Sequence, residues 1–215
     1  MERTEVEPKK PRTLPAEERR DQLLAAACAV FAEKGYHEAK ISDVTARAGV
    51  GKGTFYLYFK SKEEVYGALL DDFTRLIFLA FFIPGADEVK TGRDIRGRFE
   101  RVTRNALGLL RDNRNLARLF LQEGISWEPV FEGRVRSFYQ DLSARTAQNL
   151  AAWMAKGLLR SADPVVLAHC VLGMVERVAV QLTAGTIKGD FEALVSEVVR
   201  FELYGILADP AAAFA

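Results

Sequence analysis

The sequence predicts an all-α protein with a small N-terminal module and a larger helical body, about nine helices in all. Apolar residues recur three and four positions apart through most of the chain, and no stretch alternates apolar and polar residues as a strand does. Glycines and prolines stand at the breaks between these periodic segments. With 215 residues, of which 49% are hydrophobic, the chain can bury one or two cores.

Three helices are expected at the front of the chain. The first, over 16–34, follows from apolar residues at helical spacing and from Gly35, which suits a left-handed stop. The second spans 41–48 and the third spans 52–59, with the turn at Gly49 between them.

A longer fourth helix is expected over 62–83, where Pro84 ends it. It is too long to belong only to the small module, so we expect it to connect that module to the body. The chain then divides into a flexible basic arm over 1–13, a small helical module over 14–62 and a larger helical domain over 63–215. The arm either reaches a DNA minor groove or is a solvated tail.

The body is expected to form five further helices, separated by residues that start or stop helices. Pro129 suits a first helical turn, Asp163 and Asp190 are suitable N-caps, and Gly185 suits a C-terminal stop. The expected ranges are 94–112, 114–123, 129 to just before Gly157, 164–183 and 191–207.

The module at the front has the pattern of a DNA reader. A short helix, a glycine turn and a second short helix with a polar face form a helix-turn-helix. At about 100° per residue, Phe55 and Phe59 share one face of the third helix and should point into the core. The opposite face should meet base edges through Gly53, Thr54, Tyr56 and Leu57.

Leu57 is an apolar residue on a face that otherwise meets water. It either contacts a thymine methyl group or is one of the scattered leucines found on most protein surfaces. Gly53 has a clearer purpose, because a residue without a side chain lets the helix backbone approach DNA closely.

Positive charge is concentrated around this face. From Lys9 to Lys62 the chain has eleven Lys and Arg and six Asp and Glu, whereas from Glu63 to the end it has eighteen Lys and Arg and twenty Asp and Glu. A basic front on a near-neutral body fits a module that meets phosphates. The residues placed for phosphate contacts are Lys40, Ser42, Lys52, Tyr58 and Lys62.

The stretch 31–65 resembles the TetR family of bacterial transcriptional regulators, above all in Gly49-Val-Gly-Lys-Gly-Thr-Phe-Tyr-Leu-Tyr-Phe59. The resemblance covers about the first third of the chain. Gly51 replaces a usual Ser, which removes a capping hydroxyl, and Thr45 replaces a usual Ala at the helix crossing. The resemblance implies contact or orienting roles for Lys52, Gly53, Thr54, Tyr56, Tyr58 and Lys62.

The body is rich in aromatic residues on its predicted inner faces. Most of them are expected to be core, but the TetR resemblance implies an inducer pocket there and a homodimer formed by the last two helices. Arg177 either meets the polar end of a ligand or lies at the dimer interface or in solvent. The candidate pocket residues are Phe78, Phe82, Phe99, Phe120, Trp127, Phe138, Trp153, His169, Met174 and Arg177.

Cys28 and Cys170 lie in apolar helical patterns and are expected to be buried free thiols in a reducing compartment. The N-terminus has no apolar run of the kind found in signal peptides, and the longest such run, over 76–83, is shorter than a membrane span. We therefore expect a cytoplasmic protein with no membrane partner.

An enzyme is not expected. The Gly-Lys at 51–52 lacks the glycine spacing and the preceding strand of a phosphate loop, and no catalytic or metal-binding motif is present. The sequence predicts a repressor without a cofactor, bound to a palindromic, double-stranded operator and released by a small apolar effector. The alternative is a helical ligand-binding or scaffolding protein whose front module contacts protein. The operator, the effector and the choice between repression and activation are not encoded in any motif.

Overall fold

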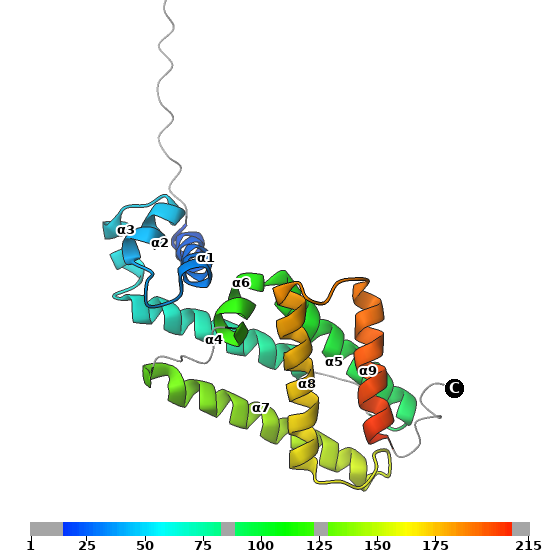
Figure 1. Ribbon diagram of the computed structural model, residues 1–215. Coiled ribbons are helices and arrows are strands. Elements are labelled where there is room, and N and C mark those ends of the chain that lie inside the picture. The colour runs from blue at the N-terminus through cyan, green and yellow to red at the C-terminus, as the bar shows by residue number, and fades with distance from the viewer. Residues whose placement is uncertain (1–14, 83–88, 123–128, 208–215) are drawn as a thin grey trace, which may run out of the picture.

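A computed structural model describes residues 15–82, 89–122 and 129–207 of the chain. Within these ranges the protein is helical, with nine α-helices and one π-helical turn (Figure 1). The elements are α1 (Ala16–Lys34), α2 (Ile41–Ala48), α3 (Lys52–Tyr58), α4 (Lys62–Phe81), α5 (Gly92–Asp112), α6 (Arg114–Ala117), the π-helical turn η1 (Arg118–Gln122), α7 (Pro129–Ala155), α8 (Pro164–Ala184) and α9 (Phe191–Ile206).

Most predicted boundaries agree with the structure to within two residues, because they rest on local capping signals. Gly35 and Gly49 end α1 and α2 with positive φ angles of 78° and 64°. The helix predicted over 114–123 is present over 114–122, but its second part differs from an α-helix: the α-helical turn α6 passes directly into the π-helical turn η1. α4 ends at Phe81, two residues earlier than expected.

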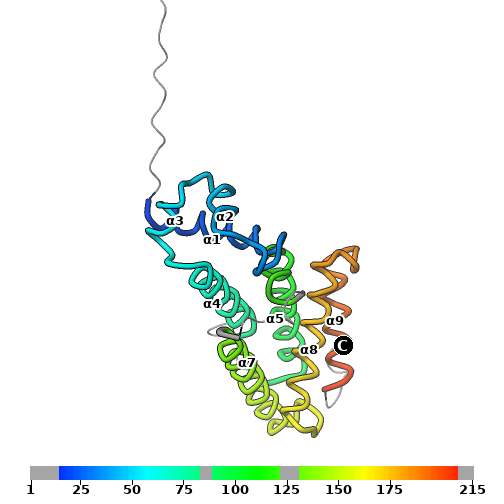
Figure 2. Tube along the Cα trace, turned by 60° about the vertical axis from the view of Figure 1, so that its left-hand side comes forward, coloured from blue at the N-terminus to red at the C-terminus, as the bar shows by residue number. Residues whose placement is uncertain are grey.

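The helices form two connected parts (Figures 1 and 2). α1, α2 and α3 gather at one end of the molecule. α4 leaves this group and runs into the body, where it packs against α5 and α7. α8 and α9 lie beside α5, and α7 packs against α8. α4 therefore contacts both parts.

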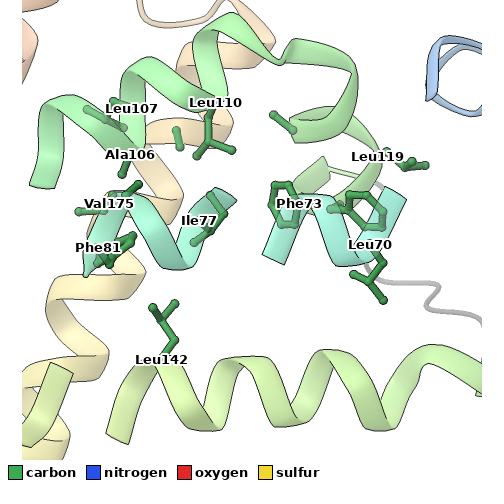
Figure 3. Packing of buried hydrophobic residues seen from close by; sticks show 14 of the residues in the cluster. Leu70, Phe73, Ile77, Phe81, Ala106, Leu107, Leu110, Leu119, Leu142 and Val175 are labelled. Carbon is green, nitrogen blue, oxygen red and sulfur yellow. The ribbon is translucent and has the colours of Figure 1, made fainter. Parts of the chain in front are cut away.

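The core of the body forms where α4, α5, α7 and α8 meet (Figure 3). α4 contributes Phe73, Ile77 and Phe81 at helical spacing, all of them buried. Burial of side chains of this size contributes about 1.5–3 kcal/mol each, so this stripe fixes the position of α4 in the body.

α4 and α7 approach each other closely near the middle of α4. A Cβ atom on Gly67 would lie 3.0 Å from an Arg134 guanidinium nitrogen and 3.3 Å from the Phe131 ring. Arg134 also forms an ion pair with Asp71 on α4. The absence of a side chain at Gly67 is therefore what admits α7 at this point.

α8 is the most apolar helix of the described part of the chain, and much of it is exposed. It meets the length and composition of a membrane span, with a mean hydropathy of 1.6 and 28% of that window buried. One such helix is weak evidence for a membrane, because a helix that packs in an interface between soluble subunits passes the same test. Its exposed surface includes Val165 and Val166.

Candidate DNA interface and ligand cavity

α3 is seated in the small module by two aromatic side chains. Phe55 and Phe59 are almost completely buried, with ring centroids 5.9 Å apart. The opposite side of the same helix is open to solvent: Tyr56 is 54% exposed and Leu57 is 81% exposed. An α-helix that presents an aromatic and an aliphatic side chain in this way is suited to enter the major groove.

Gly53 lies on this exposed side, and a Cβ atom built on it would meet no heavy atom within 4 Å. The protein itself therefore does not require glycine at this position. Close approach of the helix backbone to DNA, as expected from the sequence, would give a reason for glycine there.

The turns on both sides of α3 are held by backbone and side-chain caps. Gly51 is its N-cap and provides no side-chain hydrogen bond, as the departure from the usual Ser implied. After α3, the Ser61 hydroxyl accepts a hydrogen bond from the backbone N–H of Glu64, and the Glu64 carboxylate accepts one from the backbone N–H of Lys60. These two hydrogen bonds cap the start of α4 and tie it to the residue that links it to α3.

The predicted phosphate-binding residues occupy different environments. Lys40, Ser42 and Lys52 are exposed at the starts of α2 and α3. Tyr58 is half-buried and packs against the core of the module, as does Thr54 in part. The first three are therefore open to a partner, whereas Tyr58 can offer only part of its side chain.

The structure places Lys62 differently from the expectation. Its ammonium group donates hydrogen bonds to the backbone carbonyls of Tyr36, His37 and Ala39, at 2.7, 3.1 and 3.1 Å. It also lies 4.3 Å from the centroid of the Tyr36 ring. The three donors of Lys62 thus hold the α1–α2 turn against the start of α4, and this use of the ammonium competes with a phosphate contact.

Two further basic residues of the module were not among the predicted contacts. Lys60 is exposed immediately after α3, and its place next to the recognition helix is the signal that could have identified it. Arg47 forms two hydrogen bonds with the Glu33 carboxylate, at 2.7 and 2.6 Å, so it joins α2 to α1.

The body contains a cavity of about 50 Å³ between α4, α5, α7, α8 and α9. Its walls are mostly aromatic and aliphatic. It is lined by Phe81, Phe82, Arg98, Phe99, Val102, Thr103, Thr146, Asn149, Leu150, Trp153, Val171, Val175 and Glu202.

A second cavity of about 40 Å³ adjoins the first, and Phe81 and Val175 line both. Its polar groups are Tyr139 and Glu176, which lie 3.5 Å apart through the Tyr139 hydroxyl. Burial raises the pKa of both groups. Because Phe73 and Ile77 also line this cavity, α4 contributes a wall to each of the two spaces.

The cavities include several of the predicted pocket residues. Phe82, Phe99 and Trp153 line the first and Phe138 lines the second. Phe78 does not line either cavity, but its ring packs on Phe82 with centroids 4.7 Å apart.

The structure places the other predicted pocket residues elsewhere. Phe120 is buried core, packed on Phe73 with ring centroids 5.0 Å apart. His169 and Arg177 are exposed, and Met174 is half-buried without lining either cavity. Trp127 lies outside the described residues.

The prediction that Cys170 is buried was wrong. It failed for the same reason that His169 does not line a cavity. Cys170 is exposed, whereas Cys28 is buried as predicted, and burial raises the pKa of its thiol to about 12. The apolar pattern of α8 does not mean that its whole circumference is covered, because one side of this helix faces out of the subunit.

The cavity also contains a residue that the sequence prediction missed. Glu202 occupies the inner face of α9 with Val198, Val199, Leu203 and Ile206, at helical spacing. A single carboxylate within such an apolar stripe is a signal that could have identified it.

Comparison with known proteins identifies the family. Residues 23–69 match the family model described as bacterial regulatory proteins, tetR family. The chain is 30% identical over 192 residues to the uncharacterized HTH-type transcriptional regulator YdgC of Bacillus subtilis, covering 88% of this chain and 93% of YdgC. The chain belongs to the TetR family. It is accordingly a DNA-binding transcriptional regulator, and regulators of this family bind DNA and dimerise.

Solved structures agree with this assignment. A TetR-like transcriptional regulator from Rhodococcus sp. RHA1 matches with a TM-score of 0.70 and 27% identity, over 90% of this chain and 100% of that one. FadR of Bacillus subtilis, solved in complex with stearoyl-CoA, matches with a TM-score of 0.68 and 23% identity, over 85% and 96%. At 23% identity, the match to FadR shows a shared fold and nothing further.

Proposed function

We propose that this TetR-family regulator is a repressor that binds a palindromic operator as a homodimer and is released by a small apolar effector. The exposed face of α3, with Tyr56 and Leu57 held outward by buried Phe55 and Phe59, carries the proposal. In a two-fold dimer, two copies of α3 about 34–36 Å apart would enter successive major grooves.

The proposed homodimer uses α8 and α9. Their outer surfaces carry large exposed apolar residues, namely Val165, Val166, Phe201 and Tyr204. Exposed apolar surface of this kind is rare on a subunit that remains alone in water. Pairing of α8 and α9 with the same helices of a second copy would cover it.

The proposed effector occupies the cavities of the body, whose walls are mainly apolar. α4 supplies part of those walls and is tied at its other end to the DNA-binding module by Lys62. A ligand that moves α4 would therefore move α3. A coupling of about 1–3 kcal/mol changes operator affinity roughly 5- to 150-fold. That FadR of Bacillus subtilis was solved with stearoyl-CoA makes long acyl groups one class to test.

The operator role is tested with variants of the exposed face of α3. An operator selected from random duplexes should bind Tyr56→Ala more weakly than the wild type by tenfold or more, whereas random DNA should bind both proteins nearly equally, because Tyr56 faces base edges. Fluorescence anisotropy at a fixed salt concentration measures the affinity for each of the two DNAs.

Lys52→Ala should instead weaken binding to both DNAs. In a dimer it should make the slope of log affinity against log salt shallower by about two, because one phosphate contact is lost in each subunit. Lys188→Ala, which removes an exposed charge between α8 and α9, is the matched control. Equal loss on both DNAs for Tyr56→Ala would refute the assignment of base-reading to this face.

A further inference from the structure

Glu202 is a buried carboxyl group without a partner in the wall of the first cavity. It is 4% exposed, and neither of its carboxyl oxygens has a hydrogen-bond partner in the described structure. Buried polar groups are almost always satisfied, because an unpaired one loses its hydration without compensation. The missing partner of Glu202 therefore calls for an explanation, and the group lines a space that can receive one.

The surroundings of Glu202 indicate what kind of partner is missing. Among the described residues, α4, α7 and α8 present no titratable side chain to this cavity, and α5 presents Arg98. Arg98 is half-buried and lies 5.6 Å above the Trp153 ring, so it is partly solvated and already has a favourable contact. Glu202 has neither solvation nor a favourable contact, so the cavity residue that most needs a ligand is Glu202 and not Arg98.

We propose that the effector of this regulator is an apolar molecule that carries a basic amine, and that Glu202 binds its ammonium group. The inference rests on the proposed ligand-responsive function and specifies the chemistry of the ligand. The aromatic walls formed by Phe82, Phe99 and Trp153 would hold the apolar part. An ammonium group offers three donors to the two carboxyl oxygens that lack one.

Binding of such a ligand involves a proton. Burial raises the pKa of Glu202 to about 8, so the empty cavity holds a neutral carboxylic acid at pH 7. An alkylamine is already protonated at this pH. Formation of the ion pair therefore converts the acid to a carboxylate and releases one proton to solvent for each ligand bound.

The size of the empty cavity limits the ligand. The two spaces measure about 50 and 40 Å³, and Phe81 and Val175 line both of them. A chain of several carbons exceeds either space, so to occupy both it would have to displace a shared side chain such as Phe81 or Val175. Because Phe81 is the last residue of α4, this displacement acts on the helix that leads to the DNA-binding module.

The test compares three probes that share one apolar chain: hexylamine, 1-hexanol and hexanoate. Isothermal titration of the full-length protein should show hexylamine binding at least tenfold more tightly than either of the other two. Glu202→Gln keeps the shape of the side chain and removes the charge, and it should abolish this preference. Glu38→Gln, the same change at an exposed position of the α1–α2 turn, away from the cavity and from α8 and α9, should retain it.

Proton release provides a second measurement that does not depend on a variant folding. In buffers with different ionisation enthalpies, hexylamine binding to the wild type should release about one proton at pH 6–7. Its affinity should rise roughly tenfold from pH 6 to pH 7 and level off near pH 8. Glu202→Gln should show neither effect.

Three outcomes would overturn the inference: hexanoate or hexanol binding as tightly as hexylamine, absence of proton release, or failure of all three probes to bind. Tight hexanoate binding that is lost in Arg98→Gln would assign the cavity to an anionic ligand. None of these results bears on operator recognition, because the Tyr56 and Lys52 variants test that part of the proposed function separately.

Discussion

Lys62 is a side chain whose role depends on a contact that sequence spacing does not reveal. Its position at the start of α4 suggests a phosphate contact. The structure instead directs its ammonium group to three carbonyls of the α1–α2 turn, which lies more than twenty residues earlier in the chain. We therefore expect Lys62 to act on DNA binding through the orientation of the module rather than through charge.

Lys62→Met should lower the free energy of unfolding by about 1–2 kcal/mol, because three carbonyl oxygens lose a charged donor at a partly exposed site. It should weaken operator binding without changing the salt slope. Chemical denaturation and anisotropy measure the two effects, with Lys188→Met, at an exposed position between α8 and α9, as the control. A shallower salt slope for Lys62→Met would show that its ammonium group meets a phosphate after all.

Glu202 makes the stability of the empty protein depend on pH. In the folded protein its pKa is about 8, against 4.5 for an ordinary Glu, so the folded state keeps a proton that the unfolded state has lost. The wild type should therefore lose stability as pH rises from about 4.5 to 8. Glu202→Gln lacks this titration, so its advantage over the wild type should grow across the same interval.

The expected size of this advantage is a few kcal/mol at pH 8, with about 5 kcal/mol as the limit set by a difference of about 3.5 between the two pKa values. Urea denaturation at pH 5, 6.5 and 8 measures it. Glu38→Gln should follow the wild type, since Glu38 is exposed in the α1–α2 turn, away from α8 and α9. Parallel pH profiles for the wild type and Glu202→Gln would mean that the carboxyl group is not isolated in solution.

At the scale of elements, sequence signals predicted where helices begin and end but not what each face meets. Asp163 caps α8 through hydrogen bonds from Val165 and Val166, and such contacts are local in sequence. The surroundings of Phe120 and Phe82, in contrast, are formed by residues distant in sequence. Both are aromatic residues in apolar patterns, yet Phe120 fills the core and Phe82 lines a cavity. That difference depends on how α4, α5 and α7 pack.

The same limit applies to α8. Its apolar residues run around the whole helix, and spacing alone could not separate the side that covers the body from the side that faces outward. Val175 and Ala179 are buried, whereas Val166 and Cys170 on the outer side are exposed. In the proposed homodimer a second subunit would decide the environment of the outer side, and the sequence of a single helix carries no sign of it.

α4 should transmit ligand binding to α3, and Phe82 lies where this helix ends at the cavity. Phe82→Ser should shift the hexylamine concentration that releases operator DNA by tenfold or more. The affinity of the ligand-free protein for operator should stay within about twofold, because the module itself is untouched. Leu79→Ser, at an exposed position one turn earlier in α4, is the control. An unchanged release midpoint for Phe82→Ser would exclude this end of α4 from the response.

At the scale of the whole molecule, the dimer decides whether two recognition helices act together. Phe201 is 75% exposed and Tyr204 is 59% exposed, both on the outer side of α9. Phe201→Asp should place a charge in the centre of the proposed interface, where its desolvation is unfavourable. Sedimentation at micromolar concentration should then show a monomer, whereas Leu79→Asp, away from α8 and α9, should remain a dimer.

The same variant separates assembly from DNA contact. When two copies of α3 are joined, binding of the second half-site becomes intramolecular, and the palindrome gains 10²-fold or more in affinity over a half-site. Phe201→Asp should lose most of this gain on a full palindrome yet bind a half-site duplex as the wild type does, because Tyr56 and Lys52 are unchanged. Equal losses on the two duplexes would mean that α9 affects the module itself. A dimer that persists in Phe201→Asp would require another surface to join the subunits.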